Sequence, residues 1–155
     1  MTPAINAAKK KKIPFTVHQY THDPANEAYG KEAAERLGIA EERVFKTLVV
    51  QLDDNCLAVA VLPVSSMLSM KQMARAAGAK KAVMADKSVV ERATGYVLGG
   101  VSPLGQKKRL PTIIDSSAGS FPTIYVTAGR RGLEIELKAV DLLMLTGGSF
   151  SELCQ

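Results

Sequence analysis

Two adjacent glycines stand in the segment of this 155-residue chain that has the most evident capacity for chemistry. The segment runs from Thr94 to Arg109, and Gly99-Gly100 follow the apolar pair Val97-Leu98 within it. Because glycine has no side chain, its backbone can approach a ligand closely and present N–H groups to it. Donors held in this way can polarise a carbonyl group and stabilise an oxyanion. A glycine-rich bulge in a tightly curled sheet is the alternative, and the spacing alone leaves both interpretations open.

A single lysine interrupts a run that is otherwise suited to a buried strand. Lys46 lies within residues 44–50, which read Val-Phe-Lys-Thr-Leu-Val-Val. A lysine in such a place either points to solvent at the beginning of the strand or reaches an anionic ligand inside a pocket. The local pattern does not decide between these two interpretations.

The chain lacks the usual motifs of hydrolases and nucleotide-binding enzymes. No serine stands in a G-x-S-x-G elbow, and there is neither a Walker motif nor a G-x-G-x-x-G motif. His18 and His22 have a spacing that suits a metal on a helix, but their neighbours alternate as in a strand. We therefore expect no metal and no cofactor, and a structural or substrate-adjacent role for the histidines. An enzyme built from these residues would act on an already reactive substrate, such as an activated ester.

Basic residues give the chain a formal net charge of +5 and an isoelectric point near 9.3. This excess suggests an anionic partner, although a solvated basic surface explains it equally well. Residues 107–109, Lys-Lys-Arg, could bind phosphates or could form a solvated loop. Arg130-Arg131, between Gly129 and Gly132, is typical first of a hairpin turn, with phosphate contact as the second interpretation.

Length, cysteine content and hydropathy limit the class of protein. A chain of 155 residues fits one domain, here expected to span residues 1–155. Cys56 lies in an apolar run and is expected to be buried, whereas Cys154 is expected at a frayed C-terminus. Two cysteines so far apart predict neither a zinc site nor a disulfide framework, which indicates a reducing compartment. There is no run of 18 apolar residues and no signal peptide, so we expect a cytoplasmic protein without a membrane partner.

Helices and hairpin-forming strands alternate irregularly along the chain. Thr2 and Pro3 predict the beginning of a first helix, and Gly38 predicts the end of a second. The expected helices cover residues 3–13, 31–37, 69–77, 86–92 and 139–145, and the expected strands cover residues 15–20, 44–50, 56–64, 97–98, 111–115, 124–127 and 133–137. Without strict βαβ alternation, this order predicts an α+β fold around a mixed, curled sheet.

Nearly the whole chain resembles the free-standing bacterial Cys-tRNA(Pro) deacylases of the YbaK type, which are related to the editing domain inserted in bacterial prolyl-tRNA synthetases. The resemblance rests on several segments together, among them Tyr20-x-His22-Asp23-Pro24, Phe45-Lys46-Thr47-Leu48, the block from Thr94 to Arg109, and Gly129-Arg130-Arg131-Gly132-Leu133. It implies a mixed, barrel-like sheet flanked by helices, with one pocket for the 3′ end of a tRNA.

The resemblance also assigns roles within that pocket. It makes Lys46 the residue that positions the terminal adenosine and its phosphate, and it gives Gly99, with Pro103 at the other end of the loop, the task of holding the scissile ester. Tyr20 joins Lys46 and Gly99 as an expected catalytic residue. The expected substrate-binding residues are Tyr29, Gly100, Ser102, Pro103, Thr127 and Glu134. Relatives often have Phe, Ser and Asp at the positions of Tyr29, Thr127 and Glu134, which leaves the fine substrate preference open.

The reaction implied by the resemblance needs no protein nucleophile. The thiol of the substrate's own cysteine attacks the ester carbonyl and releases a thiolactone and free tRNA, so that the protein orients the ester and stabilises charge. Cys-tRNA(Pro) is the expected substrate, with Cys-tRNA(Cys) as a further one and prolyl-tRNA synthetase as the suggested partner. Two alternatives stay open: a deacylase for another small aminoacyl-tRNA such as Ala-tRNA(Pro), and a non-catalytic module that binds tRNA ends or a synthetase.

Overall fold

The computed structural model describes residues 1–155 and divides them into five α-helices, eight strands and two short 3₁₀ helices. The α-helices are α1 (Pro3–Lys10), α2 (Tyr29–Leu37), α3 (Met70–Ala76), α4 (Lys87–Thr94) and α5 (Ala139–Thr146). The strands are β1 (Thr16–Gln19), β2 (Phe45–Leu52), β3 (Leu57–Pro63), β4 (Ala82–Met84), β5 (Thr112–Asp115), β6 (Ile124–Arg130), β7 (Leu133–Leu137) and β8 (Ser149–Ser151). The 3₁₀ helices are η1 (Glu41–Arg43) and η2 (Ser116–Ser120).

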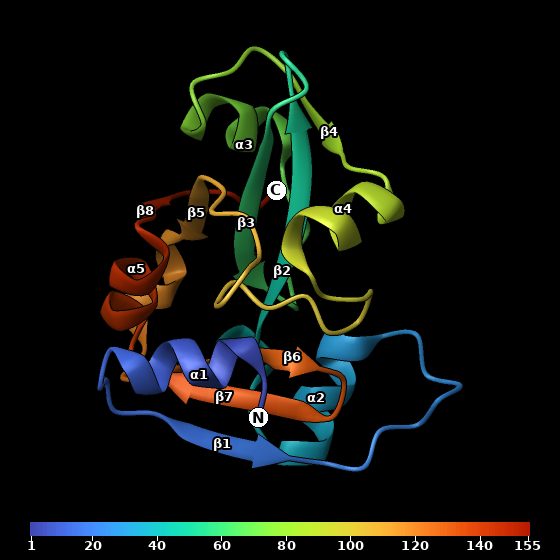
Figure 1. Cartoon of the computed structure of the whole chain (residues 1–155), viewed down its shortest axis with the longest axis vertical. Coiled ribbons are helices and arrows are strands. Elements are labelled where there is room, and N and C mark those ends of the chain that lie inside the picture. Colours follow the sequence, from blue (N-terminus) through green and yellow to red (C-terminus); the bar gives the residue numbers. More distant parts are fainter.

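The strands form two sheets. The smaller sheet is antiparallel with the order β1-β7-β6, and the larger one is mixed with the order β4-β2-β3-β5-β8. In Figure 1 the small sheet lies low in the molecule with α1 and α2, while β2 and β3 rise from it towards α3 and β4. A parallel bridge between Val44 and Tyr125 joins the beginning of β2 to β6. The expected α+β fold with mixed pairing is confirmed, although the two sheets do not close into a barrel.

Helices α1 and α2 cover opposite faces of the small sheet. Alternation along β6 turns Val126 towards the main core, which includes Ala4 and Ile5 of α1, and turns Tyr125 towards Ala33 of α2. Helix α1 begins as predicted, because the Thr2 side chain accepts a hydrogen bond from the backbone N–H of Ile5. Each face of the small sheet therefore has its own apolar layer.

Glycines end three of the helices in the left-handed conformation. Gly38 follows α2 with φ +68°, Gly95 follows α4 with φ +81°, and Gly147 follows α5 with φ +63°. Glycine adopts this conformation without the steric cost that a Cβ atom imposes. The predicted ends of the second and last helices are thus confirmed to within one residue.

Three details of the sequence interpretation are wrong. Val97 and Leu98 form a turn with exposed side chains and not a strand. Cys56 is exposed, because it ends the turn between β2 and β3 instead of entering β3. Cys154 is not frayed: it pairs with Leu68 in an isolated bridge next to the fully buried Leu153. None of the helices has the length and apolar character needed to span a membrane.

Candidate functional site

A cavity of about 320 Å³ opens where the beginning of β2 meets the small sheet. Its walls come from the beginning of α2, from β2, from the turn after α4, and from β6 and β7. Segments distant in sequence thus share one space, at the lower end of the size range of small-molecule sites. Six of the nine sequence-predicted site residues line it: Tyr20, Tyr29, Lys46, Gly99, Thr127 and Glu134.

Lys46 reaches this cavity from β2 without a carboxylate partner. Its Nζ donates a hydrogen bond to the backbone carbonyl oxygen of Ser66 at 2.7 Å, and no ion pair holds it. Burial lowers the pKa of Lys46, the nearby Cys154 acts in the opposite direction, and the positive charge of Lys31 lowers it further. Of the two interpretations of this lysine, the structure supports the one in which it faces a pocket.

Glu134 is a buried carboxyl group on the wall of the same cavity. The residue is only 5% exposed, and burial raises the pKa of its side chain to about 8. No hydrogen bond or ion pair compensates this burial. Burial therefore favours the protonated carboxyl group at neutral pH, and a cation beside it would favour the ionised form.

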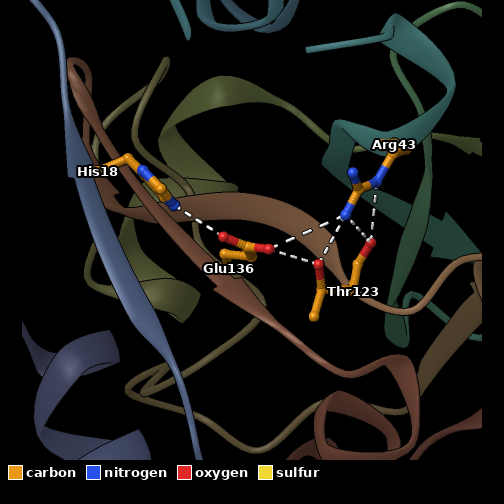
Figure 2. Close-up of polar contacts among 4 residues, drawn as sticks. All are labelled: His18, Arg43, Thr123 and Glu136. Carbon is orange, nitrogen blue, oxygen red and sulfur yellow. Dashed lines mark hydrogen bonds and ion pairs between the residues drawn. The ribbon is translucent and has the colours of Figure 1, made fainter.

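Glu136, two residues further along β7, lies on the same face of the strand in the opposite electrostatic environment. Figure 2 shows its carboxylate between His18, Thr123 and Arg43, with His18 Nε2 at 2.9 Å and the Thr123 hydroxyl at 2.5 Å. Burial alone raises the pKa of Glu136, but the hydrogen bonds from Thr123 and His18 outweigh it and hold the pKa low. This cluster therefore anchors β1 and η1 to β7 and leaves Glu134 as the carboxyl group of the cavity.

Two further polar residues of the cavity escaped the sequence analysis as site residues. The Oγ1 atom of Thr47 is buried without a hydrogen-bond partner, and the exposed Lys31 stands at the rim. A buried hydroxyl group without a partner is costly unless a ligand or water satisfies it. Thr47 directly follows Lys46, so its position in the resembling Phe45-Lys46-Thr47-Leu48 segment was the available signal. Lys31 carried no local signal.

Gly99 faces the cavity and contacts its aromatic wall. Its φ of +90° belongs to the left-handed region, and a Cβ atom there would lie 3.4 Å from the ring of Tyr29. Tyr29 is the first residue of α2. The backbone of the turn after α4 thus borders the cavity at Gly99. For this glycine, the structure agrees with the interpretation that the backbone approaches a ligand.

Gly100, Ser102 and Pro103 do not line this cavity. A Cβ atom on Gly100 would lie 2.8 Å from the Cα atom of Arg130, so the close backbone approach at this glycine is made to β6 and not to a ligand. Ser102 is fully buried, and its hydroxyl group accepts a hydrogen bond from the N–H of Leu104. Pro103 borders a separate cavity of about 220 Å³. The structure therefore gives these three residues positions that support the loop.

The basic clusters have different environments. Lys108 and Arg109 border the second cavity with exposed side chains. Arg130 and Arg131 stand at the turn between β6 and β7, which confirms the predicted hairpin. Arg130 is exposed, whereas Arg131 turns inward and forms an ion pair of 3.1 Å with the buried Glu32.

No group of three or more His, Cys, Asp or Glu side chains is arranged to hold a metal ion. His18 belongs to the cluster with Glu136, and His22 is exposed. The cavity contains no serine, cysteine or histidine, and its ionisable groups are Tyr20, Tyr29, Lys31, Lys46 and Glu134. Such a site can bind and polarise an ester, but it has no activated serine or cysteine nucleophile of the usual kind.

Comparison with known proteins decides the family. The family model described as the aminoacyl-tRNA editing domain matches residues 22–145. The chain belongs to the aminoacyl-tRNA editing domain family. A protein of Enterococcus faecalis, provisionally named Cys-tRNA(Pro)/Cys-tRNA(Cys) deacylase EbsC, is 37% identical over 152 residues, which are 98% of this chain and 92% of that protein. The resemblance expected from the sequence is thereby confirmed.

Solved structures show the same fold for other proteins of low sequence identity. The hypothetical protein APE2540 aligns with a TM-score of 0.88 and 24% identity, covering 99% of both chains. A protein provisionally described as a trans-editing enzyme for prolyl tRNA synthetase aligns with a TM-score of 0.86 and 23% identity, covering 99% of this chain and 95% of that one. The matched range of the editing domain contains every wall of the cavity except Tyr20, which lies two residues before it.

Proposed function

We propose that this protein removes cysteine from mischarged Cys-tRNA(Pro), and also from Cys-tRNA(Cys), by a reaction in which the substrate's own thiol is the nucleophile. The observation that carries this proposal is the composition of the cavity of the editing domain. It holds a lysine without an ion-pair partner, a buried carboxyl group and a buried hydroxyl group without a hydrogen-bond partner, but no serine, cysteine or histidine. The name of the E. faecalis relative supports the choice of cysteine.

The charged groups of the cavity match the two ends of an aminoacyl ester. We assign Glu134 to the α-ammonium group, because it is the only carboxyl group of the cavity and a cation beside it would favour its ionised form. We assign Lys46 to a phosphate or another oxygen of the terminal nucleotide. Its ammonium group would exchange only one hydrogen bond, to the neutral carbonyl oxygen of Ser66, for a bond to the anion. Thr47 and the backbone at Gly99 are left for the ester between these two ends.

The proposed reaction balances without water. The thiol gives up its proton, its sulfur bonds to the ester carbonyl carbon, and the bond from this carbon to the ribose oxygen breaks. The ribose oxygen takes up a proton, and the products are a thiolactone and tRNA with a free terminal hydroxyl group. The cavity accelerates this step by holding the thiol near the carbonyl carbon. Hydrolysis would instead consume water and yield free cysteine, so the product distinguishes the two reactions.

A reaction that requires the substrate's thiol would also explain why a separate editing protein is useful. Cysteine and proline are similar in size, and pockets separate near-isosteric apolar substrates by only about 10–200-fold. A reaction that requires sulfur spares prolyl-tRNA whatever the fit. We infer from the trans-editing description of one structural relative that prolyl-tRNA synthetase supplies the mischarged tRNA. Such an encounter takes place where translation does, in agreement with the cytoplasmic location expected from the sequence.

Deacylation assays on four substrates test the proposal. Purified Cys-tRNA(Pro), Ser-tRNA(Pro), Ala-tRNA(Pro) and Pro-tRNA(Pro) are incubated with the wild type, Lys46→Ala and Lys10→Ala. We expect loss of cysteine alone, with recovery of the thiolactone, and a rate about 100-fold lower in Lys46→Ala because the anionic end is no longer located. Lys10 is exposed on α1 and does not line the cavity, so Lys10→Ala is the matched control.

The other outcomes separate the alternatives. Equal loss of serine or alanine would retain the deacylase and contradict the thiol reaction. Wild-type turnover in Lys46→Ala would contradict the role of this lysine. No loss of any amino acid, together with binding of tRNA, would favour the non-catalytic module.

A further inference from the structure

Arg131 occupies an unusual place for a turn residue, because its side chain is only 16% exposed. From the β6–β7 turn its side chain reaches residues 23–26, which are part of the connection from β1 to α2. Its guanidinium group donates hydrogen bonds to the carbonyl oxygens of Asp23, at 2.6 Å, and Asn26. The same group pairs with Glu32 of α2, which is only 2% exposed. One side chain thus ties a turn, a loop and a helix together.

Glu32, the ion-pair partner of Arg131, contacts the same loop. Its second carboxylate oxygen accepts a hydrogen bond of 2.8 Å from the backbone N–H of Asp23. Both ends of the Arg131–Glu32 pair therefore hold the same segment. All three polar contacts of Arg131 are made by Nη2, while its Nε is buried without a partner. The pair thus makes three hydrogen bonds to the backbone of residues 23–26, which distinguishes it from an ion pair that joins only two side chains.

Arg131 also contacts Tyr29, a residue that lines the cavity. The guanidinium carbon of Arg131 lies 4.4 Å from the centre of the Tyr29 ring, a cation–π contact. The ring's edge lies against Gly99, where a Cβ atom would be 3.4 Å away. Arg131 itself does not line the cavity, whereas Ala28, Tyr29 and Gly99 do. The position of this aromatic wall depends on a residue behind it.

We propose that Arg131, paired with Glu32, is a positioning residue for the reaction: it seats Tyr29 against Gly99 and so fixes the width of the cavity in which the ester is held. This inference deepens the proposed function and depends on it for the activity assay. A wall displaced by about 1 Å costs an enzyme that works by orientation far more than it costs affinity. The loss should therefore appear in kcat rather than in KM.

The first experiment compares Arg131→Met with Arg43→Met. Arg43 offers matched chemistry, since its guanidinium group lies 3.9 Å from the carboxylate of Glu136 (Figure 2) and 5.2 Å from the centre of the Tyr125 ring. It does not line the cavity. We expect both variants to lose stability, but only Arg131→Met to lose at least tenfold in kcat on Cys-tRNA(Pro) with KM changed less than twofold. Equal kcat values in the two variants would overturn the proposal.

A double-mutant cycle tests the path through Tyr29. If Arg131 acts by seating this ring, Tyr29→Leu should lower kcat to a similar degree, and the double variant should fall no lower than the worse single one. Tyr29→Phe keeps the ring face over Arg131 and should therefore lose less kcat than Tyr29→Leu. Additive losses would show that Arg131 acts by another route and would contradict the proposal.

A readout without activity separates this inference from the proposed function. Hydrogen exchange of residues 23–31 should become faster by at least tenfold in Arg131→Met and in Glu32→Gln, and should be unchanged in Arg43→Met. Arg131→Lys retains a charged nitrogen but loses the planar group that lies over the Tyr29 ring, so its exchange should lie between those of the wild type and Arg131→Met. An unchanged exchange rate of residues 23–31 in Arg131→Met would contradict the proposal that Arg131 holds this segment in place. If the wild type deacylates no tRNA, exchange still decides whether Arg131 holds the wall.

Discussion

The two glutamates of β7 differ only in what surrounds them. Glu134 and Glu136 are the same residue type, two positions apart on one face, yet burial raises the pKa of the first to about 8 while hydrogen bonds hold that of the second low. The sequence identified Glu134 as a pocket residue only through the family resemblance. Its protonation depends on the absence of partners from β1, η1 and the Thr123 turn, which residue types and spacing do not encode.

The raised pKa of Glu134 predicts a pH dependence of stability. The folded protein retains this proton up to about pH 8, whereas the unfolded chain loses it near the ordinary value of 4.5. Between these values the folded state binds more protons, so the free energy of unfolding falls as the pH rises. Relative to Glu134→Gln, the wild type should lose about 3 kcal/mol between pH 5 and pH 8. Urea denaturation at several pH values measures this difference.

Glu136→Gln is the control for this prediction. The pKa of Glu136 is low in the folded protein, so its contribution to stability is present above pH 4.5 and is lost only at more acidic pH. Histidine changes charge near neutral pH, and Glu136 is paired with His18, so this comparison is made in a His18→Asn background. There the stability difference caused by Glu136→Gln should stay constant between pH 5 and pH 8. Parallel curves for the wild type and Glu134→Gln over the same range would contradict the buried, unpaired carboxyl group.

At the scale of elements, local signals predicted most of the fold. Thr2 and Pro3 begin α1, left-handed glycines end α2 and α5, and runs rich in apolar and β-branched residues mark β2, β3, β6 and β7. These signals depend on residues close in sequence. The short edge strands β4 and β8 were missed because their pairing is decided by distant partners. Val97-Leu98 was assigned to a strand for its apolar character, although both side chains are exposed.

Gly99 predicts a local test of the turn after α4. Gly99→Ala should lower stability by about 1–2 kcal/mol because of its left-handed backbone. It should also lower deacylation, because the added methyl group enters the cavity beside Tyr29. Gly119→Ala is the matched control, since φ is not positive there and no atom lies within 4 Å of its Cβ position. Thermal denaturation and the Cys-tRNA(Pro) assay measure both effects, and full activity in a folded Gly99→Ala would contradict the position of this turn.

At the scale of the molecule, the sequence predicted the fold class but not the division into two sheets. The two sheets meet at the bridge between Val44 and Tyr125, a contact between residues 81 positions apart. The cavity lies at this junction of segments that are distant in sequence, so its set of lining residues could be predicted only through the family resemblance. Of the 20 lysines and arginines that produce the net charge of +5, only Lys31 and Lys46 line the cavity.

This distribution predicts a shallow salt dependence of tRNA binding. Each phosphate contact adds about 0.7–0.9 to the slope of log affinity against log salt concentration. With about three contacts the slope should be about −2 to −3, and Lys31→Gln should reduce it by roughly one contact. Lys10→Gln should leave it unchanged. Filter binding of uncharged tRNA at several salt concentrations measures these slopes, and an affinity independent of salt would contradict any phosphate contact.

The hydrogen bond from Lys46 to the Ser66 carbonyl also governs how the empty protein responds to its medium. A carbonyl group is neutral, so the ammonium group retains its attraction for anions and has no counter-ion to release first. Phosphate and sulfate are divalent and small enough for the cavity, so they should act as competitive inhibitors, whereas acetate or chloride should compete less. The measured KM would then depend on the buffer anion at constant ionic strength, and Lys46→Ala would abolish this dependence.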